Sequence, residues 1–143
     1  MTNVEPGKPV DQGRITSEYG EPRINSKGQK YEHSGVDITI PEEWKSVSGP
    51  PVNAAYGGKV VFVGEQIGYG NCVEVSLGGG NSSFYAHLAD GSASHLKIGD
   101  VVRKGDILGI MGTTGRATGL HLHFEFRVNG AHINPETVRG LYP

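Results

Sequence analysis

Four histidines and one aspartate lie in three short segments of the chain in which polar and apolar residues alternate. Imidazole nitrogens and carboxylate oxygens bind zinc, and a catalytic zinc site uses three protein ligands and keeps one position open. Cys72 is the only cysteine, so a closed site built from several thiolates is excluded. These residue types therefore suit metal-assisted hydrolysis. The five residues are His33, Asp37, His87, His121 and His123.

The segment Leu120–Arg127 predicts a strand that carries two of these histidines on one face. Successive side chains of a strand point to opposite faces. His121, His123, Glu125 and Arg127 would share the polar face, and the four apolar residues between them would face a core. A helix would turn residues two apart toward nearly opposite sides. The alternation therefore favours a strand.

The other two segments show the same pattern. Residues 33–40 would place His33 and Asp37 on the polar side of a strand. A spacing of four also suits one face of a helix, but the β-branched residues of this segment favour a strand. Residues 82–88 form the third predicted strand. Its polar face would carry Ser83, Tyr85 and His87, and its apolar face Phe84, Ala86 and Leu88.

The three polar faces could converge on one exposed groove. His33, Asp37 and His123 form a suitable ligand set for one Zn²⁺ ion, because they can surround an ion from two neighbouring strands. His87 and His121 would then flank the ion. Glu125 is a candidate partner that orients a ligand imidazole, and a plain surface carboxylate is the alternative.

Composition predicts an all-β chain in one domain. The 143 residues include 23 glycines and 8 prolines, which indicate many short turns between short strands. Residues 1–12 are polar and are expected to form a leader or linker outside the core. A single domain would then span residues 13–143. Cys72 would be a small buried filler, and His95 and His132 would be surface residues.

Further elements follow from local patterns. Residues 100–102 and 107–111 are expected to form two strands that pair with each other. Asn129-Gly130 predicts a tight hairpin turn. Asn134-Pro135-Glu136 predicts the cap and first turn of a short C-terminal helix. The remaining strands are expected at residues 14–20, 59–63 and 72–77.

Charge and hydropathy exclude several partners. The formal net charge is −2 without a long basic run, so a nucleic-acid groove has little support. No apolar stretch approaches the roughly 18 residues that span a bilayer, and the first residues contain no signal peptide. We therefore expect neither a nucleic-acid partner nor a membrane span, and nothing in this sequence that directs its own export.

Three ordered motifs resemble the lysostaphin-type zinc peptidoglycan endopeptidases. They are His33-x-x-x-Asp37, Tyr85-Ala86-His87-Leu88 and Thr118-Gly119-Leu120-His121-Leu122-His123-Phe124-Glu125. The resemblance covers roughly residues 13–135 and includes Tyr19-Gly20-x-x-Arg23, Gly99-Asp100-Val101-Val102 and the glycine-rich lead-in 112–119. The sequence departs from the family pattern at Leu120, because the family usually has proline before the His-Leu-His motif.

The resemblance implies an antiparallel β-sheet core with a long substrate groove. It implies one Zn²⁺ bound by His33, Asp37 and His123, and catalytic histidines at His87 and His121. Arg23 and Tyr85 are possible substrate contacts. Specificity would lie in loops such as Pro41 to Pro51 and Gly64 to Asn71.

The implied function is hydrolysis of a peptide bond in the stem peptides or cross-bridges of bacterial peptidoglycan, outside the cytoplasm or in the periplasm. An inert domain that binds the wall or activates another wall enzyme is an alternative, and so is a structural component of a phage tail. A monomer is the expected state. Together with the lack of a signal peptide, the resemblance implies a phage virion or lysis-released enzyme, or an excised domain of a secreted protein.

Overall fold

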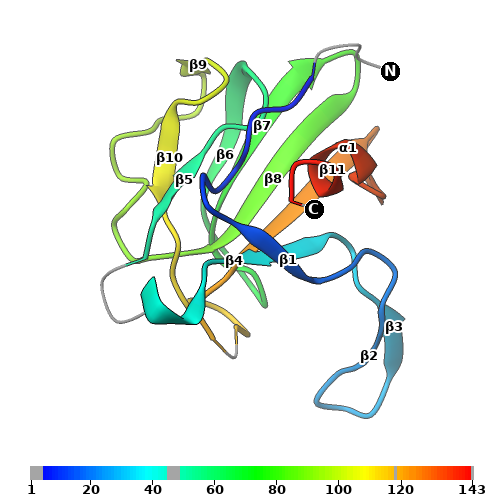
Figure 1. Ribbon diagram of the computed structural model, residues 1–143. Coiled ribbons are helices and arrows are strands. Elements are labelled where there is room, and N and C mark those ends of the chain that lie inside the picture. Colours follow the sequence, from blue (N-terminus) through cyan, green and yellow to red (C-terminus); the bar gives the residue numbers. More distant parts are fainter. Residues whose placement is uncertain (1–4, 45–48, 118, 143) are drawn as a thin grey trace.

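The computed structural model describes residues 5–44, 49–117 and 119–142, and nearly all of its regular elements are β-strands (Figure 1). One short α-helix, α1, and one 3₁₀ turn, η1, accompany the strands in these ranges. The expectation of an all-β fold is therefore confirmed. In chain order the elements are β1 (Arg14–Ser17), β2 (Pro22–Ile24), β3 (Lys30–Glu32), β4 (Val36–Thr39), η1 (Glu42–Trp44), β5 (Pro51–Asn53), β6 (Gly58–Gln66), β7 (Gly70–Gly78), β8 (Asn81–Leu88), β9 (Val101–Val102), β10 (Ile107–Ile110), β11 (Leu122–Val128), β12 (Ala131–Ile133) and α1 (Glu136–Arg139).

The main sheet places the three histidine-bearing segments next to one another. Its strands are ordered β1-β4-β11-β8-β7-β6-β9, and β12 pairs with β11. All of these pairs are antiparallel, as expected. Strand β11 pairs with β4 on one side and with β8 on the other, so segments far apart in sequence meet at the centre of the sheet (Figure 1). Two smaller sheets, β2-β3 and β5-β10, flank it.

The main hydrophobic core covers one face of this sheet. Leu122, Phe124 and Phe126 of β11 point into it, and Val36 and Ile38 of the neighbouring β4 do the same. The alternation of β11 is therefore confirmed: its apolar residues face the core, and His123 and Glu125 face the other side. Removing water from these large apolar side chains stabilises the sheet that carries the polar face.

The expected pairing of residues 100–102 with 107–111 is wrong. Strand β9 pairs with β6, with Val102 opposite Gly58, and extends the edge of the main sheet. Strand β10 pairs with β5, with Ile107 opposite Asn53. The turn between them is held by a hydrogen bond from the backbone N–H of Asp106 to the Arg103 carbonyl. Each of the two strands nevertheless pairs with a strand that is longer than its expected partner is in the structure.

The N-terminal residues contribute to the core, contrary to expectation. Val10 is fully buried, and its N–H and carbonyl both bond to the phenolic oxygen of Tyr142, at 3.0 and 2.8 Å. The backbone N–H of Gly7 donates to the Ala55 carbonyl. Val10 and the buried Pro9 dock this segment, and Tyr142 and the Asn53 N–H satisfy its backbone groups.

The predicted hairpin turn is confirmed, and the predicted C-terminal helix is present without the predicted side-chain cap. Strands β11 and β12 join through Asn129 and Gly130, whose φ angles of 51° and 83° are both positive. A two-residue hairpin of this kind requires that conformation, which asparagine and glycine adopt most readily. Helix α1 begins after Pro135, although no side chain caps it.

Cys72 is protected from reagents by its surroundings. It is buried with Phe84 and Ala86 on the face of the sheet opposite the main core, where burial raises the pKa of its thiol to about 12. We expect no reaction with an aromatic disulfide reagent at pH 8 in the native protein, since only thiolates react, and one thiol titrated after unfolding. Rapid stoichiometric labelling of the native protein would contradict this placement.

Candidate metal centre and its groove

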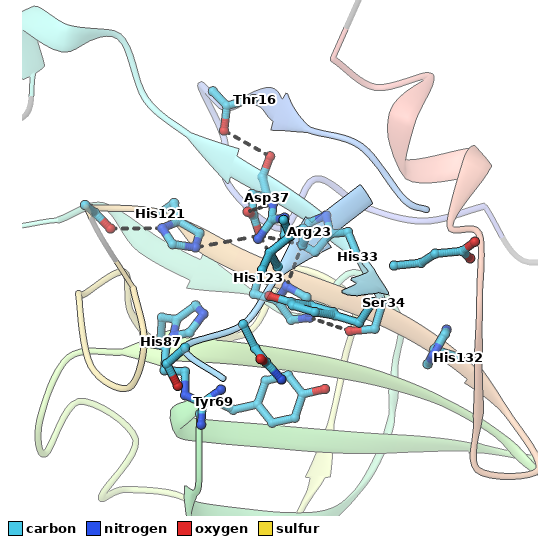
Figure 2. Close-up of a pocket in the computed structure, with 18 of the residues that line it drawn as sticks. Thr16, Arg23, His33, Ser34, Asp37, Tyr69, His87, His121, His123 and His132 are labelled. Carbon is cyan, nitrogen blue, oxygen red and sulfur yellow. Dashed lines mark hydrogen bonds and ion pairs between the residues drawn. The ribbon is translucent and has the colours of Figure 1, made fainter. Parts of the chain in front are cut away.

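One donor atom from each of the three predicted ligands, His33, Asp37 and His123, forms a corner of a compact triangle (Figure 2). Nε2 of His33 lies 3.1 Å from Oδ1 of Asp37 and 3.1 Å from Nδ1 of His123, and the Asp37 and His123 atoms are 3.2 Å apart. Ligands of a tetrahedral zinc ion lie about 3.3–3.5 Å from one another. The three side chains are buried, and all three line a groove of about 1200 Å³, which leaves a fourth direction open.

Strand register creates this triangle. Asp37 of β4 and His123 of β11 are directly paired, so their side chains lie on the same face. His33 precedes β4 and reaches the same point because Gly35 passes against the backbone carbonyl of Phe124. A Cβ atom at Gly35 would overlap that carbonyl oxygen, so glycine is needed there.

Each member of the triangle is held from behind by a second group. Nδ1 of His33 donates to the Glu18 carbonyl at 2.9 Å, which leaves its Nε2 as the unprotonated nitrogen in the neutral ring. Nε2 of His123 lies 2.7 Å from Oε2 of Glu125. The guanidinium of Arg23 donates to Oδ2 of Asp37 at 3.1 Å, so only Oδ1 faces the histidines. Such partners fix the orientation of metal ligands.

The electrostatics of the triangle favour an ionised carboxylate. Burial alone would raise the pKa of Asp37, but the adjacent imidazoles of His123 and His33 outweigh it and hold the pKa well below its usual range. Burial would lower the pKa of His123, but the adjacent Asp37 and Glu125 carboxylates raise it. Two nitrogens and one carboxylate oxygen in this arrangement are a suitable donor set for zinc.

His87 reaches the same groove through an irregularity in β8. It adopts a left-handed backbone conformation, with φ at 63°. The pairing of β7 with β8 also shifts register here: Asn71 and Val73 are two residues apart, whereas their partners, Leu88 and Tyr85, are three apart. The extra residue forms a bulge, and a bulge changes which face the following side chains occupy.

The expected faces of residues 82–88 are therefore wrong. Tyr85 lies on the core face, fully buried, with its ring centroid 5.2 Å from that of Phe124. Its hydroxyl accepts a bond from the Ala55 N–H and donates to Ser83. Tyr85 is thus a core residue and no substrate contact. His87 lies two residues after Tyr85 and would share its face in a regular strand. Only the bulge lets His87 turn to the opposite face.

Two imidazoles stand beside the triangle without joining it. Nδ1 of His87 donates to the Thr114 carbonyl at 2.7 Å, and Nδ1 of His121 donates to the Gly119 carbonyl at 2.9 Å. Their ring centroids are 4.8 Å apart. Since carbonyl oxygens only accept, the Nε2 atom of each neutral ring carries the lone pair. Burial lowers the pKa of His87 to about 4, so this ring is neutral at pH 7.

Replacing His87 with glycine is expected to change the free energy of unfolding by less than about 1 kcal/mol. Relief of the left-handed conformation, about 1–2 kcal/mol, offsets the lost hydrogen bond and the added chain entropy of glycine. Ala86→Gly, one residue earlier, gains no such relief and should destabilise by about 0.5–1 kcal/mol. Denaturant titration compares the two. Greater destabilisation by His87→Gly would contradict the strain.

Several groove residues carried no clear signal in the sequence. The groove is lined by the hairpin β2-β3 on one side and by the β6-β7 turn with residues 116 and 119 on another. His132, expected to be a plain surface residue, lines it and bonds to the Tyr19 hydroxyl at 3.0 Å. Tyr69 stacks beside His123, with ring centroids 5.5 Å apart (Figure 2).

The two loops expected to control specificity differ in their placement. Residues 67–69, from the predicted segment 64–71, line the groove, and Ile67 is 95% exposed there. Residues 45–48 of the other predicted loop lie outside the described residues, and its described residues do not line the groove. Of the predicted substrate contacts, Arg23 lines the groove but is bonded to Asp37 and Ser17.

A protein-family model decides the classification. The model described as Peptidase family M23 matches residues 31–135 of the chain. The chain belongs to peptidase family M23. The matched range contains all five residues of the triangle and its flanking imidazoles, and the resemblance to lysostaphin-type enzymes is confirmed.

Sequence and structure relatives agree with this membership. The M23 chain is 36% identical over 131 residues to "Peptidoglycan DD-endopeptidase ShyC" of Vibrio cholerae, covering 91% of this chain and 28% of that protein. A "zinc containing peptidase" from V. cholerae superimposes with a TM-score of 0.77, 30% identity and coverage of 98% and 41%. The lysostaphin catalytic domain from Staphylococcus simulans gives a TM-score of 0.72, 30% identity and coverage of 89% and 92%.

The M23 chain spans between 17% and 31% of the full length of curated relatives such as ShyC. Among the described residues, no helix has the length and apolar character needed to cross a membrane.

Proposed function

We propose that this M23 domain is a zinc-dependent endopeptidase that hydrolyses peptide bonds in bacterial peptidoglycan. The observation that carries the proposal is the triangle of donor atoms from His33, Asp37 and His123, with two further imidazoles beside it in one groove. Relatives named as a peptidoglycan endopeptidase and as a zinc-containing peptidase support the substrate and the metal.

His33, Asp37 and His123 would hold a single Zn²⁺, since each is oriented by its own partner. When bound, zinc supplies Lewis acidity that activates water near neutral pH and polarises a peptide carbonyl. The Arg23 guanidinium donates a hydrogen bond to Oδ2 of Asp37, so this carboxylate offers only Oδ1 to the metal. These residues supply binding and orientation, and the proton transfers fall to the flanking imidazoles.

His87 would act as the proton acceptor. Its buried ring is neutral at pH 7, and its Nδ1–H is committed to Thr114, so its Nε2 lone pair is available to accept a proton from water. His121 would stabilise the tetrahedral oxyanion and help to pass the proton taken up by His87 to the leaving amine. Its Nε2 lies 3.6 Å from Oδ1 of Asp37, beside the triangle.

The groove accommodates an extended peptide. It runs past the triangle between the β2-β3 hairpin and the β6-β7 turn, and exposed Ile24, Tyr31 and Ile67 line it. Such apolar side chains beside a polar centre suit a peptide of mixed character. We propose that the substrate lies along this groove with its scissile carbonyl at the open side of the triangle.

Metal analysis and peptidoglycan hydrolysis test the proposal together. Purified protein should contain one zinc per chain and release amines from purified peptidoglycan, and a chelator should stop the release until zinc is restored. The absence of both zinc and amine release would overturn the enzyme and favour an inert wall-binding domain or a structural phage tail component. All five residues that the proposed zinc peptidase requires are present in this chain, which argues against those alternatives.

The bond cleaved is best identified from the products. Mass spectrometry of fragments from walls with direct cross-links and walls with glycine bridges separates cleavage at D-alanyl bonds from cleavage within the bridge. The DD-endopeptidase relative favours the first. We further propose that the domain acts outside the cytoplasm, as a phage lysis or tail-associated enzyme or as part of a longer secreted protein, and that a monomer suffices because one chain supplies the whole site.

A further inference from the structure

The polar face of β11 continues past the triangle into a second, buried cluster of charges. Glu125 is only 1% exposed, and both of its oxygens are engaged. Oε2 accepts from Nε2 of His123 and from the Ser34 hydroxyl, each at 2.7 Å. Oε1 accepts from Nε of Arg127 at 2.8 Å. A carboxylate this buried requires such partners, because water cannot solvate it.

Arg127 ties this carboxylate to the neighbouring strands. Its guanidinium lies 3.9 Å above the centre of the Phe84 ring of β8 and donates to Oε1 of Glu74 of β7 at 3.4 Å. Glu74 in turn accepts from the Ser82 hydroxyl at 2.7 Å. The register explains the row, because Phe84 is paired with Glu125 on one side and with Glu74 on the other.

A purely structural ion pair does not explain this arrangement. Buried ion pairs are often no more stabilising than apolar residues of similar size. Here, however, one oxygen of the Glu125 carboxylate accepts from Arg127. Its other oxygen faces Nε2 of His123, the ring nitrogen that points away from the triangle. The guanidinium also bonds through Nε to Glu125 and through a terminal nitrogen to Glu74, so the fork is fixed at two points and stacked on a ring.

We propose that Arg127 is a positioning residue of the metal centre and acts through Glu125. By balancing the charge of Glu125 and fixing its plane, Arg127 keeps a hydrogen-bond acceptor on Nε2 of His123. That bond commits the Nε2 proton and turns the Nδ1 lone pair toward His33 and Asp37. Arg127 lies outside the triangle and outside the residues that line the groove. The inference rests on the proposed zinc function and deepens it.

Zinc affinity, measured by competition with a coloured chelator, tests the role without recourse to activity. Arg127→Met keeps an unbranched side chain that can pack on Phe84 but loses every charge-assisted hydrogen bond. We expect zinc to bind about 10–100-fold more weakly, the usual cost of losing an outer partner of a ligand. Arg127→Lys keeps the charge but not the two-point fork and should fall between. Arg103→Met is the matched control, because Arg103 is exposed in the turn between β9 and β10 and does not line the groove.

A second readout separates positioning from general stability. The ¹⁵N shifts of the His123 ring report which nitrogen carries the proton, and Arg127→Met should increase exchange between the tautomers, whereas Arg103→Met should not. Should Arg127→Met fail to fold, Glu74→Gln replaces it. That variant removes only the far anchor and should weaken zinc binding less, in the same direction.

Wild-type zinc affinity in Arg127→Met, or in both Arg127→Lys and Glu74→Gln, would overturn the inference, even with a lowered melting temperature. A wild-type chain that binds zinc but cleaves no peptidoglycan would contradict the proposed function and leave this inference standing. A wild-type chain that binds no zinc would overturn both.

Discussion

Replacement of His123 by alanine is expected to abolish both zinc binding and peptidoglycan hydrolysis. The substitution removes one of three ligand atoms and also leaves the buried Glu125 carboxylate without the imidazole that it bonds at 2.7 Å. The two remaining ligands, His33 and Asp37, are too few for a catalytic zinc site, which uses three protein ligands. Zinc content by atomic emission and amine release from purified walls are the measurements.

His95→Ala is the control for this substitution, because His95 is exposed and bonds to the Ile107 carbonyl. It should keep full zinc content and full activity. Retention of one zinc per chain in His123→Ala, with activity lost, would show that the metal has another set of ligands. A loss of folding is distinguished by far-ultraviolet circular dichroism, and His123→Gln, of similar size, then takes the place of the alanine variant.

Replacement of His121 by alanine is expected to separate metal binding from catalysis. Its Nε2 stands 3.6 Å from the nearest oxygen of Asp37, outside the triangle, and its Nδ1 is held by Gly119. Zinc content should stay at one per chain, whereas kcat should fall about 10²–10⁴-fold, the usual contribution of a positioned acid or base. KM should change little, since the imidazole acts mainly in the transition state.

The contrast between the two variants is the informative result. His121 and His123 are two residues apart on one segment, so an effect of general disruption would strike both alike. Equal loss of zinc in His121→Ala and His123→Ala would show that the proposed division between ligand and catalytic group is wrong. Steady-state kinetics on a soluble cross-linked peptide, together with metal analysis of the same samples, provides the comparison.

Much of this arrangement could be predicted from alternation alone. The period of two in β11 correctly assigned His123 and Glu125 to one face and Phe124 to the core, because a regular strand obeys that period. The same held for Asp37 in β4. For β8 the period failed, since the bulge at His87 cannot be recognised from residue types, and Tyr85 was assigned to the wrong face as a result.

Partners between strands were harder to predict than faces. Arg127 shares its predicted face with Glu125, but its bond to Glu74 depends on the order β11-β8-β7, which no local pattern contains. The same limit explains the two short strands β9 and β10, which are neighbours in sequence and belong to different sheets. Val10 is held in part by Tyr142, which lies at the opposite end of the chain and bonds to its backbone.

The central place of β11 in the sheet bears on how the protein folds. His123 lies 86 residues from Asp37 and 90 from His33 in sequence, so the site depends on contacts of very high sequence separation. Such contacts pay a large loop-closure entropy and form slowly. An N-terminal fragment that ends before residue 120 lacks both His121 and His123. It also lacks β11, the strand that lies between β4 and β8 in the sheet. Hydrolytic competence would therefore arise late, when the last long strand enters the sheet.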